Sequence, residues 1–344
     1  MKTVHSESHR LHDGTVELIG GSLVPSFECP RRAEIVLSRI AETRLGPVVA
    51  PASHGIEQAA LVHDPAFVRF LATAYDEWAE EHGETTALPM TWPCRSLRQV
   101  PPTRIEGRLG FYSFDAGAPL ARGTFRAAAS AVDVALTALD IVAGGENAAF
   151  ALCRPPGHHA TPDQMGGYCY LNNAAIAAEK AARRGARVAI LDVDYHHGNG
   201  SQTAFYHRPD ILFVSIHGDP REEYPYFLGH ADETGEGAGE GFNLNLPLPW
   251  GSSWDRYSEA LARAIGRVRD FAPDLVVVSL GLDTYRQDPI SHFLLDHDHY
   301  LRMGAAIATI GGPTLFVFEG GYAVEALGIN TVNVLSAFED SVRR

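Results

Sequence analysis

The sequence is short of basic residues. Of 344 residues, 28 are Lys or Arg and 42 are Asp or Glu, which gives a formal net charge of −14 at pH 7. A protein that binds DNA or RNA needs a basic face to neutralise phosphates, so this balance argues against a nucleic-acid partner. An acidic surface instead raises the local concentration of cationic ligands.

Cysteines and long hydrophobic runs are also scarce. The four cysteines show no C-x-x-C spacing, which is typical of free thiols in a reducing compartment. No apolar run reaches the roughly 20 residues that a membrane-spanning helix needs. Residues 1–14 lack the apolar core of a secretory signal. We therefore expect a cytoplasmic protein without a membrane span.

What the sequence does contain is an alternation of short apolar runs and amphipathic segments. Strands alternating with helices predict an α/β fold, with a mostly parallel sheet covered on both faces. With 45% hydrophobic residues and no internal repeat, residues 1–344 are interpreted as one domain. The predicted strands are 3–5, 148–152, 188–193, 211–216, 275–280 and 314–318, and the predicted helices are 31–43, 65–83, 124–143, 172–184, 201–206, 254–271, 299–310 and 324–337.

Residues 84–122 break this alternation. They are rich in Pro, Gly, Arg and aromatic residues and show no clear periodicity. A long irregular segment in a compact protein is usually functional or lies at an interface. The alternative, a solvated surface loop, fits the aromatic content less well.

The stretch 189–200, AILDVDYHHGNG, carries the most chemistry. Alternation along a strand aims Asp192, Asp194 and His196 at one region beyond its carboxyl end, where open parallel sheets bind ligands. Buried carboxylates need a compensating cation, and a carboxylate and imidazole set suits zinc or a similar divalent ion. Taken alone, the motif could also be a strand-end turn. His197 is turned away from His196 and is interpreted as a structural neighbour.

Polar residues follow other predicted strands too, so their side chains should converge at one edge of the sheet. Three of them could bind a metal and leave a fourth position for a water of lowered pKa. A histidine pair could supply a general base and its acid or electrostatic partner, and a tyrosine could donate to a developing oxyanion. This combination predicts metal-assisted hydrolysis of an amide-like bond. The metal ligands are Asp194, His196 and Asp283, the pair is His158 and His159 with Asp192 behind it, and the tyrosine is Tyr322.

Five motifs resemble the histone deacetylase superfamily: RPPGHHA, GGYCYLNNAA, LDVDYHHGNG, SLGLDTYRQDP and EGGY. The resemblance covers most of the chain. It implies an arginase/deacetylase-like fold and a deacetylase with one zinc ion per chain, with Fe²⁺ as the alternative metal. It implies the same roles for the metal ligands, the histidine pair and the tyrosine named in the preceding paragraph.

The same resemblance implies further site residues. A structural potassium ion would involve Asp192, Asp194 and His196 together with Ser215 and Ile216. Asn199 stands where animal class I members have a carboxylate, which leaves His159 with a neutral partner. The walls of the acyl-lysine-like channel would be Gly167, Tyr168 and Tyr224.

Outside these motifs, SESHRLHDGTVELIGGSLVPSFE, RIEGRLGFYSFD and HGDPREEYPYFLG are similar to the bacterial acetylpolyamine amidohydrolases. This likeness implies N-acetylated polyamines as substrates: acetylputrescine, acetylcadaverine or acetylspermidine. It also implies a homodimer in which residues 84–122 form the interface and the rim of the active site. Glu17 and Glu106 would bind distal ammonium groups, Glu106 reaching across the dimer. Both could instead be ordinary surface glutamates.

Three alternatives stay open at this point. An acetyl-lysine protein deacetylase or a broad acylamide hydrolase would use the same chemistry on another substrate. A binuclear manganese ureohydrolase would need additional bridging ligands. A catalytically inactive protein could bind polyamines without turnover.

Asp288, before a proline, is interpreted as a turn residue and not as a ligand.

Overall fold

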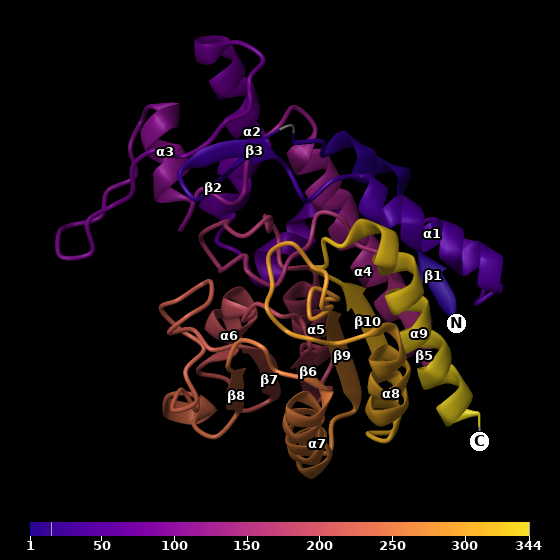
Figure 1. The fold of residues 1–344 in the computed structure, drawn as a ribbon. Coiled ribbons are helices and arrows are strands. Elements are labelled where there is room, and N and C mark those ends of the chain that lie inside the picture. Colours follow the sequence, from indigo (N-terminus) through magenta and orange to yellow (C-terminus); the bar gives the residue numbers. More distant parts are fainter. Residues whose placement is uncertain (15, 344) are drawn as a thin grey trace.

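The computed structural model describes residues 1–14 and 16–343, and its centre is a parallel β-sheet (Figure 1). Eight strands are hydrogen-bonded in the order β4-β1-β5-β10-β9-β6-β7-β8. Every pairing in this sheet is parallel, which confirms the predicted α/β class. The strands are β1 (Lys2–Val4), β4 (Val48–Val49), β5 (Ala148–Ala151), β6 (Val188–Asp192), β7 (Ile211–Gly218), β8 (Asn243–Leu248), β9 (Leu275–Leu280) and β10 (Thr314–Phe318).

Alternation along the strands divides their side chains between two hydrophobic cores. In β6, Val188 and Ile190 pack into one core, and Ala189 and Leu191 pack into the other. The first core is closed by α4 (Thr124–Ala143), α5 (Asn173–Ala182) and α6 (Asn199–Phe205). The second is closed by α1 (Arg31–Thr43), α7 (Trp254–Phe271), α8 (His297–Ala308) and α9 (Val324–Val342). The sheet is therefore buried on both faces, as parallel sheets are.

Three strand regions were not predicted, of which β4 is the shortest. β8 contains two Asn and a Pro and, within residues 1–14 and 16–343, pairs only with β7 at the sheet edge, where proline is tolerated. Residues 16–25, for which no strand was predicted, form an antiparallel hairpin, β2 (Val16–Ile19) with β3 (Ser22–Pro25). Gly20 and Gly21 make its turn with φ of 58° and 80°, the left-handed conformation that a two-residue hairpin requires. Short 3₁₀ turns, η1 (Glu7–Leu11), η2 (Ile56–Leu61) and η3 (Gly237–Gly239), complete the described elements.

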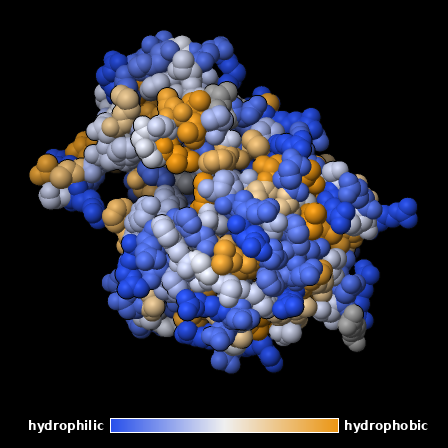
Figure 2. Space-filling view, in the orientation of Figure 1, coloured by the Kyte–Doolittle hydropathy of each residue, from blue (hydrophilic) through white to orange (hydrophobic). Residues whose placement is uncertain are grey.

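The segment between α2 (Pro65–His82) and α3 (Ile105–Phe111) extends away from the body as a loop (Figure 1). We call residues 83–104 the arm. Figure 2 shows hydrophobic side chains at its tip. α3 is a short helix inside the stretch 84–122, for which no periodicity was recognised. The exposed large hydrophobic residues of the arm are Met90, Trp92, Leu97 and Val100.

Helix ends follow local sequence. The Asp64 side chain accepts a hydrogen bond from the backbone N–H of Ala66, with Pro65 at the first position of α2. Asn172 caps α5 through the backbone N–H of Ala175. In the described part of the chain, none of the helices has both the length and the apolar character that crossing a membrane requires.

A buried histidine behind α5 makes stability depend on pH. His63 bonds the carbonyl of Thr161 through Nδ1 at 2.9 Å and accepts from the N–H of Asn172 through Nε2 at 2.8 Å. Burial lowers the pKa of His63 to about 4 because it disfavours the charged ring. Only the neutral ring can both donate to Thr161 and accept from Asn172. As the pH falls below about 6.5, the His63 ring is therefore protonated in the unfolded chain before it is protonated in the folded chain. The His63 contribution to the free energy of unfolding therefore decreases as the pH falls from 6.5 to 4.

We expect His63→Gln to flatten this dependence. Between pH 7 and pH 5 the His63 contribution to the free energy of unfolding should fall by about 2 kcal/mol in the wild type. Urea unfolding at the two pH values measures it. The exposed His207→Gln is the control, which should keep the wild-type dependence. Equal pH dependence in His63→Gln and the wild type would contradict the assignment.

Candidate active site

The acidic residues past β6 are positioned by turns and not by strand alternation. β6 ends at Asp192, so Asp194 and His196 lie beyond the strand. Asp192 Oδ1 accepts from the N–H of Asp194 at 3.1 Å, and Asp194 Oδ1 accepts from the N–H of His196 at 3.0 Å. Asp283 follows β9, and its Oδ1 accepts from the N–H of Tyr195 at 2.8 Å. These side-chain to backbone bonds fix where each carboxylate points.

Asp194, His196 and Asp283 form a buried cluster whose ligand atoms lie within 4.8 Å of one another. His196 Nδ1 is 3.0 Å from Asp283 Oδ2 and 3.6 Å from Asp194 Oδ1. Among the described residues neither carboxylate pairs with a lysine or arginine. Burial and the Asp194 charge raise the pKa of Asp283 to about 7. This donor set, with two carboxylates that no lysine or arginine in the described chain neutralises, fits a divalent metal ion.

The backbone around this cluster leaves no room for an added side chain. A Cβ at Gly320 would lie 2.6 Å from both Asp194 Oδ2 and Asp283 Oδ2. The Gly320 N–H donates to Asp194 Oδ2 at 2.8 Å. Glycine at this position lets the loop after β10 approach the carboxylates closely.

The two adjacent histidines have different partners. His158 Nδ1 lies 3.0 Å from Asp192 Oδ2, and His159 Nδ1 lies 2.6 Å from Asn199 Oδ1. Burial alone would lower the pKa of His158, but the Asp194 and Asp192 carboxylates raise it to about 10. Burial, and then the charge of His158, hold the pKa of His159 well below its usual value. The pair therefore combines a charged and a neutral imidazole, with rings 4.0 Å apart.

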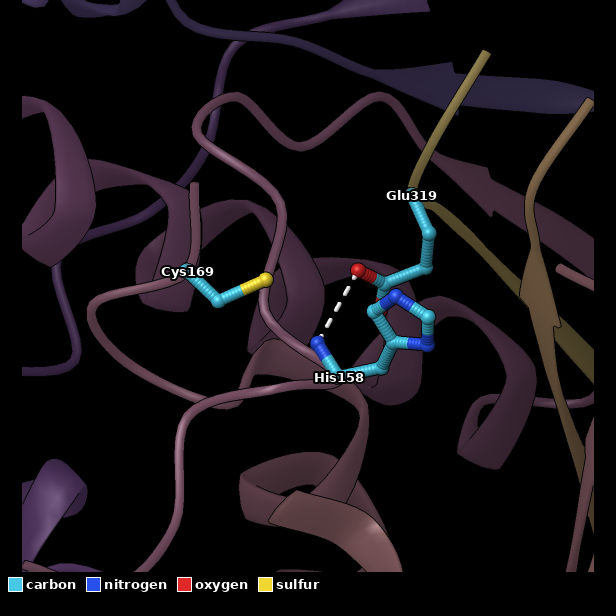
Figure 3. Close-up of side chains that lie close together, drawn as sticks. All are labelled: His158, Cys169 and Glu319. Carbon is cyan, nitrogen blue, oxygen red and sulfur yellow. Dashed lines mark hydrogen bonds between the residues drawn. The ribbon is translucent and has the colours of Figure 1, made fainter. Parts of the chain in front are cut away.

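Glu319, on the loop after β10, supports the backbone of the histidine pair (Figure 3). Its Oε2 accepts from the N–H groups of Gly157 at 2.7 Å and His158 at 3.1 Å. Burial raises the pKa of Glu319 to about 7. Cys169 lies beside these two residues, but the His158 ring is already bonded to Asp192. We therefore interpret the group in Figure 3 as support for the loop and not as a second metal site.

The loop that carries Tyr322 is held by residues from two other segments of the chain. Asp288 Oδ2 accepts from the N–H of Tyr322 at 2.6 Å, so the residue expected to be a simple turn fixes this backbone. Arg32 donates to the carbonyls of Gly321 at 2.7 Å and Glu319 at 2.6 Å. Its guanidinium lies 4.8 Å from the centre of the Tyr322 ring. Burial raises the pKa of Tyr322 well above its usual value, so the hydroxyl keeps its proton and can donate.

A buried ion-pair network behind this loop was missed by sequence reasoning. Arg154 forms two 2.8 Å hydrogen bonds to the Glu28 carboxylate, and Arg32 forms a third at 2.8 Å. Burial opposes ionisation, but these arginines and His12 hold the pKa of Glu28 below its usual range. Arg154 belongs to the RPPGHHA motif, which was the available signal; nothing local marked Glu28.

A cavity of about 360 Å³ leads from the surface to His159, His196 and Tyr322. Gly167 has φ 51°, and a Cβ there would lie 2.5 Å from His159 Cδ2. The Tyr224 ring centre is 5.1 Å from that of His159. The structure thus brings three predicted wall residues together with the histidines and the metal-binding cluster. These wall residues are Gly167, Tyr168 and Tyr224.

The two predicted carboxylates of the pocket lie in different places. Glu17, on β2, lines the cavity and accepts from the N–H of Phe27 at 2.9 Å. Burial raises its pKa, and the Tyr168 hydroxyl bonds it. Glu106, on α3, lies outside this cavity and bonds His82 at 3.0 Å and Arg104 at 3.1 Å. Within one chain Glu106 therefore does not line the cavity, and its carboxylate pairs with Arg104 at the surface.

Of the residues predicted to hold potassium, Asp192 lies on β6, Ser215 and Ile216 lie on β7, and Asp194 and His196 follow β6 in the chain. Ser215 is opposite Asp192 in the register of the two strands, and Ile216 follows it. The Ser215 hydroxyl is 2.8 Å from His217 Nδ1. His197 lies outside the metal-binding cluster, with Nε2 3.0 Å from Gln202 Oε1.

Comparison with known proteins gives a consistent result. The histone deacetylase domain model matches residues 26–338. Acetylpolyamine amidohydrolase 2 of Pseudomonas aeruginosa is 56% identical over 98% of this chain and 99% of its own length. Acetylpolyamine amidohydrolase of Mycoplana ramosa is 47% identical over 97% of this chain and 98% of its own length. A crystal structure of acetylpolyamine aminohydrolase from Burkholderia pseudomallei superposes with a TM-score of 0.94 at 40% identity, covering 99% of each chain.

The match to the domain model spans most of the chain, and the relatives align with it over nearly their whole length. The superposition extends the likeness to the fold. The chain belongs to the histone deacetylase family of metal-dependent amidohydrolases.

Proposed function

We propose that this protein is a zinc-dependent amidohydrolase that removes the acetyl group from N-acetylated polyamines and releases polyamine and acetate. The observation that carries the proposal is one cavity that His159, His196 and Tyr322 line together. The rest of the metal-binding cluster lies beside His196, and His158 lies beside His159. Asp194, His196 and Asp283 would hold the zinc ion. When bound, zinc polarises the amide carbonyl and lowers the pKa of a bound water.

The chain's own residues would carry the proton transfers. Asn199 Oδ1 accepts from His159 Nδ1, which leaves Nε2 of this neutral ring free to take a proton from the attacking water. His158, held as a cation by Asp194 and Asp192, would stabilise the negative charge that develops beside it. The protonated Tyr322 hydroxyl would donate to the oxyanion. An imidazolium of this pair would then protonate the departing amine.

The pocket supports a slender cationic substrate. Glu17 is a buried carboxylate in its wall, and the net charge of the chain is −14. The relatives named as acetylpolyamine amidohydrolases support acetylputrescine, acetylcadaverine and acetylspermidine as the substrate class.

The wider assembly belongs to the same proposal. We infer one deacetylase domain over residues 1–344, a homodimer formed through residues 84–122, and Glu106 reaching the partner's pocket. The arm, with Met90 83% exposed, supports such an interface. A structural potassium ion would involve Asp192, Asp194, His196, Ser215 and Ile216. The four free cysteines support a reducing, cytoplasmic location.

The decisive experiment compares kcat/KM for acetylputrescine, acetylcadaverine and an acetyl-lysine peptide, before and after chelation. We expect a preference for the acetylated diamines, loss of activity with chelator, and recovery on adding zinc. Repeating the recovery with Fe²⁺ tests the metal. Equal efficiency on the peptide would favour the alternative, an acetyl-lysine deacetylase or broad acylamide hydrolase. Activity that survives full metal removal would refute the metal site.

A further inference from the structure

Two cavities adjoin each other at the mouth of the site. The first, of about 360 Å³, reaches His159 and Tyr322. The second, of about 870 Å³, lies between the arm and residues 224–228. Asp115, Tyr224 and Tyr226 line both cavities, so these side chains belong to the partition between them.

Asp115 connects two walls of the first cavity. Its Oδ2 accepts from the Tyr224 hydroxyl at 2.6 Å and from the N–H of Gly167 at 3.1 Å. Its Oδ1 accepts from the N–H of Gly117 at 2.8 Å, which fixes the carboxylate in its own turn. Hydrogen bonds to a carboxylate are stronger than those between neutral groups. One side chain from the segment 84–122 therefore holds Tyr224 against the turn at Gly167.

The Tyr224 ring makes further contacts with neighbouring aromatic side chains. The ring stands edge-on to His159, with centres 5.1 Å apart, and stacks on Phe114 at 6.4 Å. These contacts position the ring beside the histidine. The hydroxyl donates its hydrogen bond to Asp115, so removing this bond leaves the outer end of the ring next to the larger cavity.

We propose that the hydrogen bond between Asp115 and Tyr224 is a specificity-determining latch, which keeps the partition closed and limits the substrate pocket to an unbranched chain. Without the latch, the Tyr224 ring would turn toward the larger cavity, and amides with bulkier amine portions would enter. This inference rests on the proposed function, because it takes a linear acetylated amine as the preferred substrate.

Tyr224→Phe tests the latch because it removes one oxygen and keeps the ring. The readout is the ratio of kcat/KM for an acetyl-lysine peptide to that for acetylputrescine. We expect this ratio to rise about tenfold or more in Tyr224→Phe, in the range that pocket shape contributes to discrimination. Asp115→Asn should shift the ratio in the same direction. Tyr75→Phe, on α2 and outside both cavities, is the matched control and should keep the wild-type ratio.

A second measurement separates this inference from the proposed function. Hydrogen–deuterium exchange of residues 222–228 should be faster in Tyr224→Phe than in the wild type. If the wild type prefers acetylputrescine and the ratio stays unchanged in the variant, the latch is wrong and the proposed function stands. If the wild type prefers the peptide, the proposed substrate is wrong and exchange decides: faster exchange supports the latch, and unchanged exchange overturns it.

Discussion

Replacing Tyr322 by phenylalanine should lower kcat by about 10²–10³-fold, the usual effect of removing one donor to an oxyanion. The change deletes the hydroxyl and keeps the ring, which packs 4.8 Å from the Arg32 guanidinium and 5.3 Å from the Tyr168 ring. The backbone bond from Tyr322 to Asp288 is also unaffected. Because the donor acts mainly in the transition state, KM should change much less than kcat.

Steady-state kinetics on acetylputrescine measure this effect, with metal content and thermal unfolding recorded for the same preparation. Both controls should match the wild type. A variant that binds metal, unfolds at the wild-type temperature and retains wild-type kcat would exclude Tyr322 from catalysis.

Asp283→Asn should stabilise the metal-free protein against unfolding and weaken its affinity for the metal. The amide is the same size, and its carbonyl can still accept from the N–H of Tyr195. Without metal, Asp283 and Asp194 are two carboxylates in one buried cluster, and burial with the Asp194 charge raises the pKa of Asp283 to about 7. Neutralising one of them should raise the melting temperature of the metal-free chain. Metal affinity should fall by more than about 100-fold, because an anionic ligand is lost.

Thermal unfolding without zinc measures the expected gain in stability, and thermal unfolding with zinc measures the expected loss of metal binding. In the wild type, zinc at 1,000 times its Kd should add about 4 kcal/mol of stability, and in Asp283→Asn most of this increment should disappear. Activity should fall with metal occupancy. The exposed Asp232→Asn is the matched control. A variant that gains as much stability from zinc as the wild type would remove Asp283 from the metal site.

The features predicted most accurately from the sequence are those that a local pattern encodes. α4 and α7 have the predicted bounds, because apolar residues recur at helical spacing through both. The convergence of Asp194, Asp283 and Tyr322 followed from parallel topology, since each lies after a strand of one sheet. The roles assigned to these residues stay predictions for the experiments above.

The remaining features depend on contacts between distant segments. Glu28 and Arg154 are separated by 126 positions, and neither neighbourhood indicates an ion pair. Asp115 lies in a stretch without periodicity, so its bond to Tyr224 had no sequence signal. β8 was missed because Asn and Pro disfavour a strand, and only pairing with β7 at the edge makes the segment extended.

The position of β10 has a consequence for biosynthesis. β10 lies between β5 and β9, so it joins β4-β1-β5 to β9-β6-β7-β8. During translation, the residues of β10 leave the ribosome after every other strand. Until then β5 and β9 expose edges that can pair with other chains. Slow elongation after residue 280 would prolong this state, so the yield of native protein should be sensitive to chaperones and to codon choice in this region.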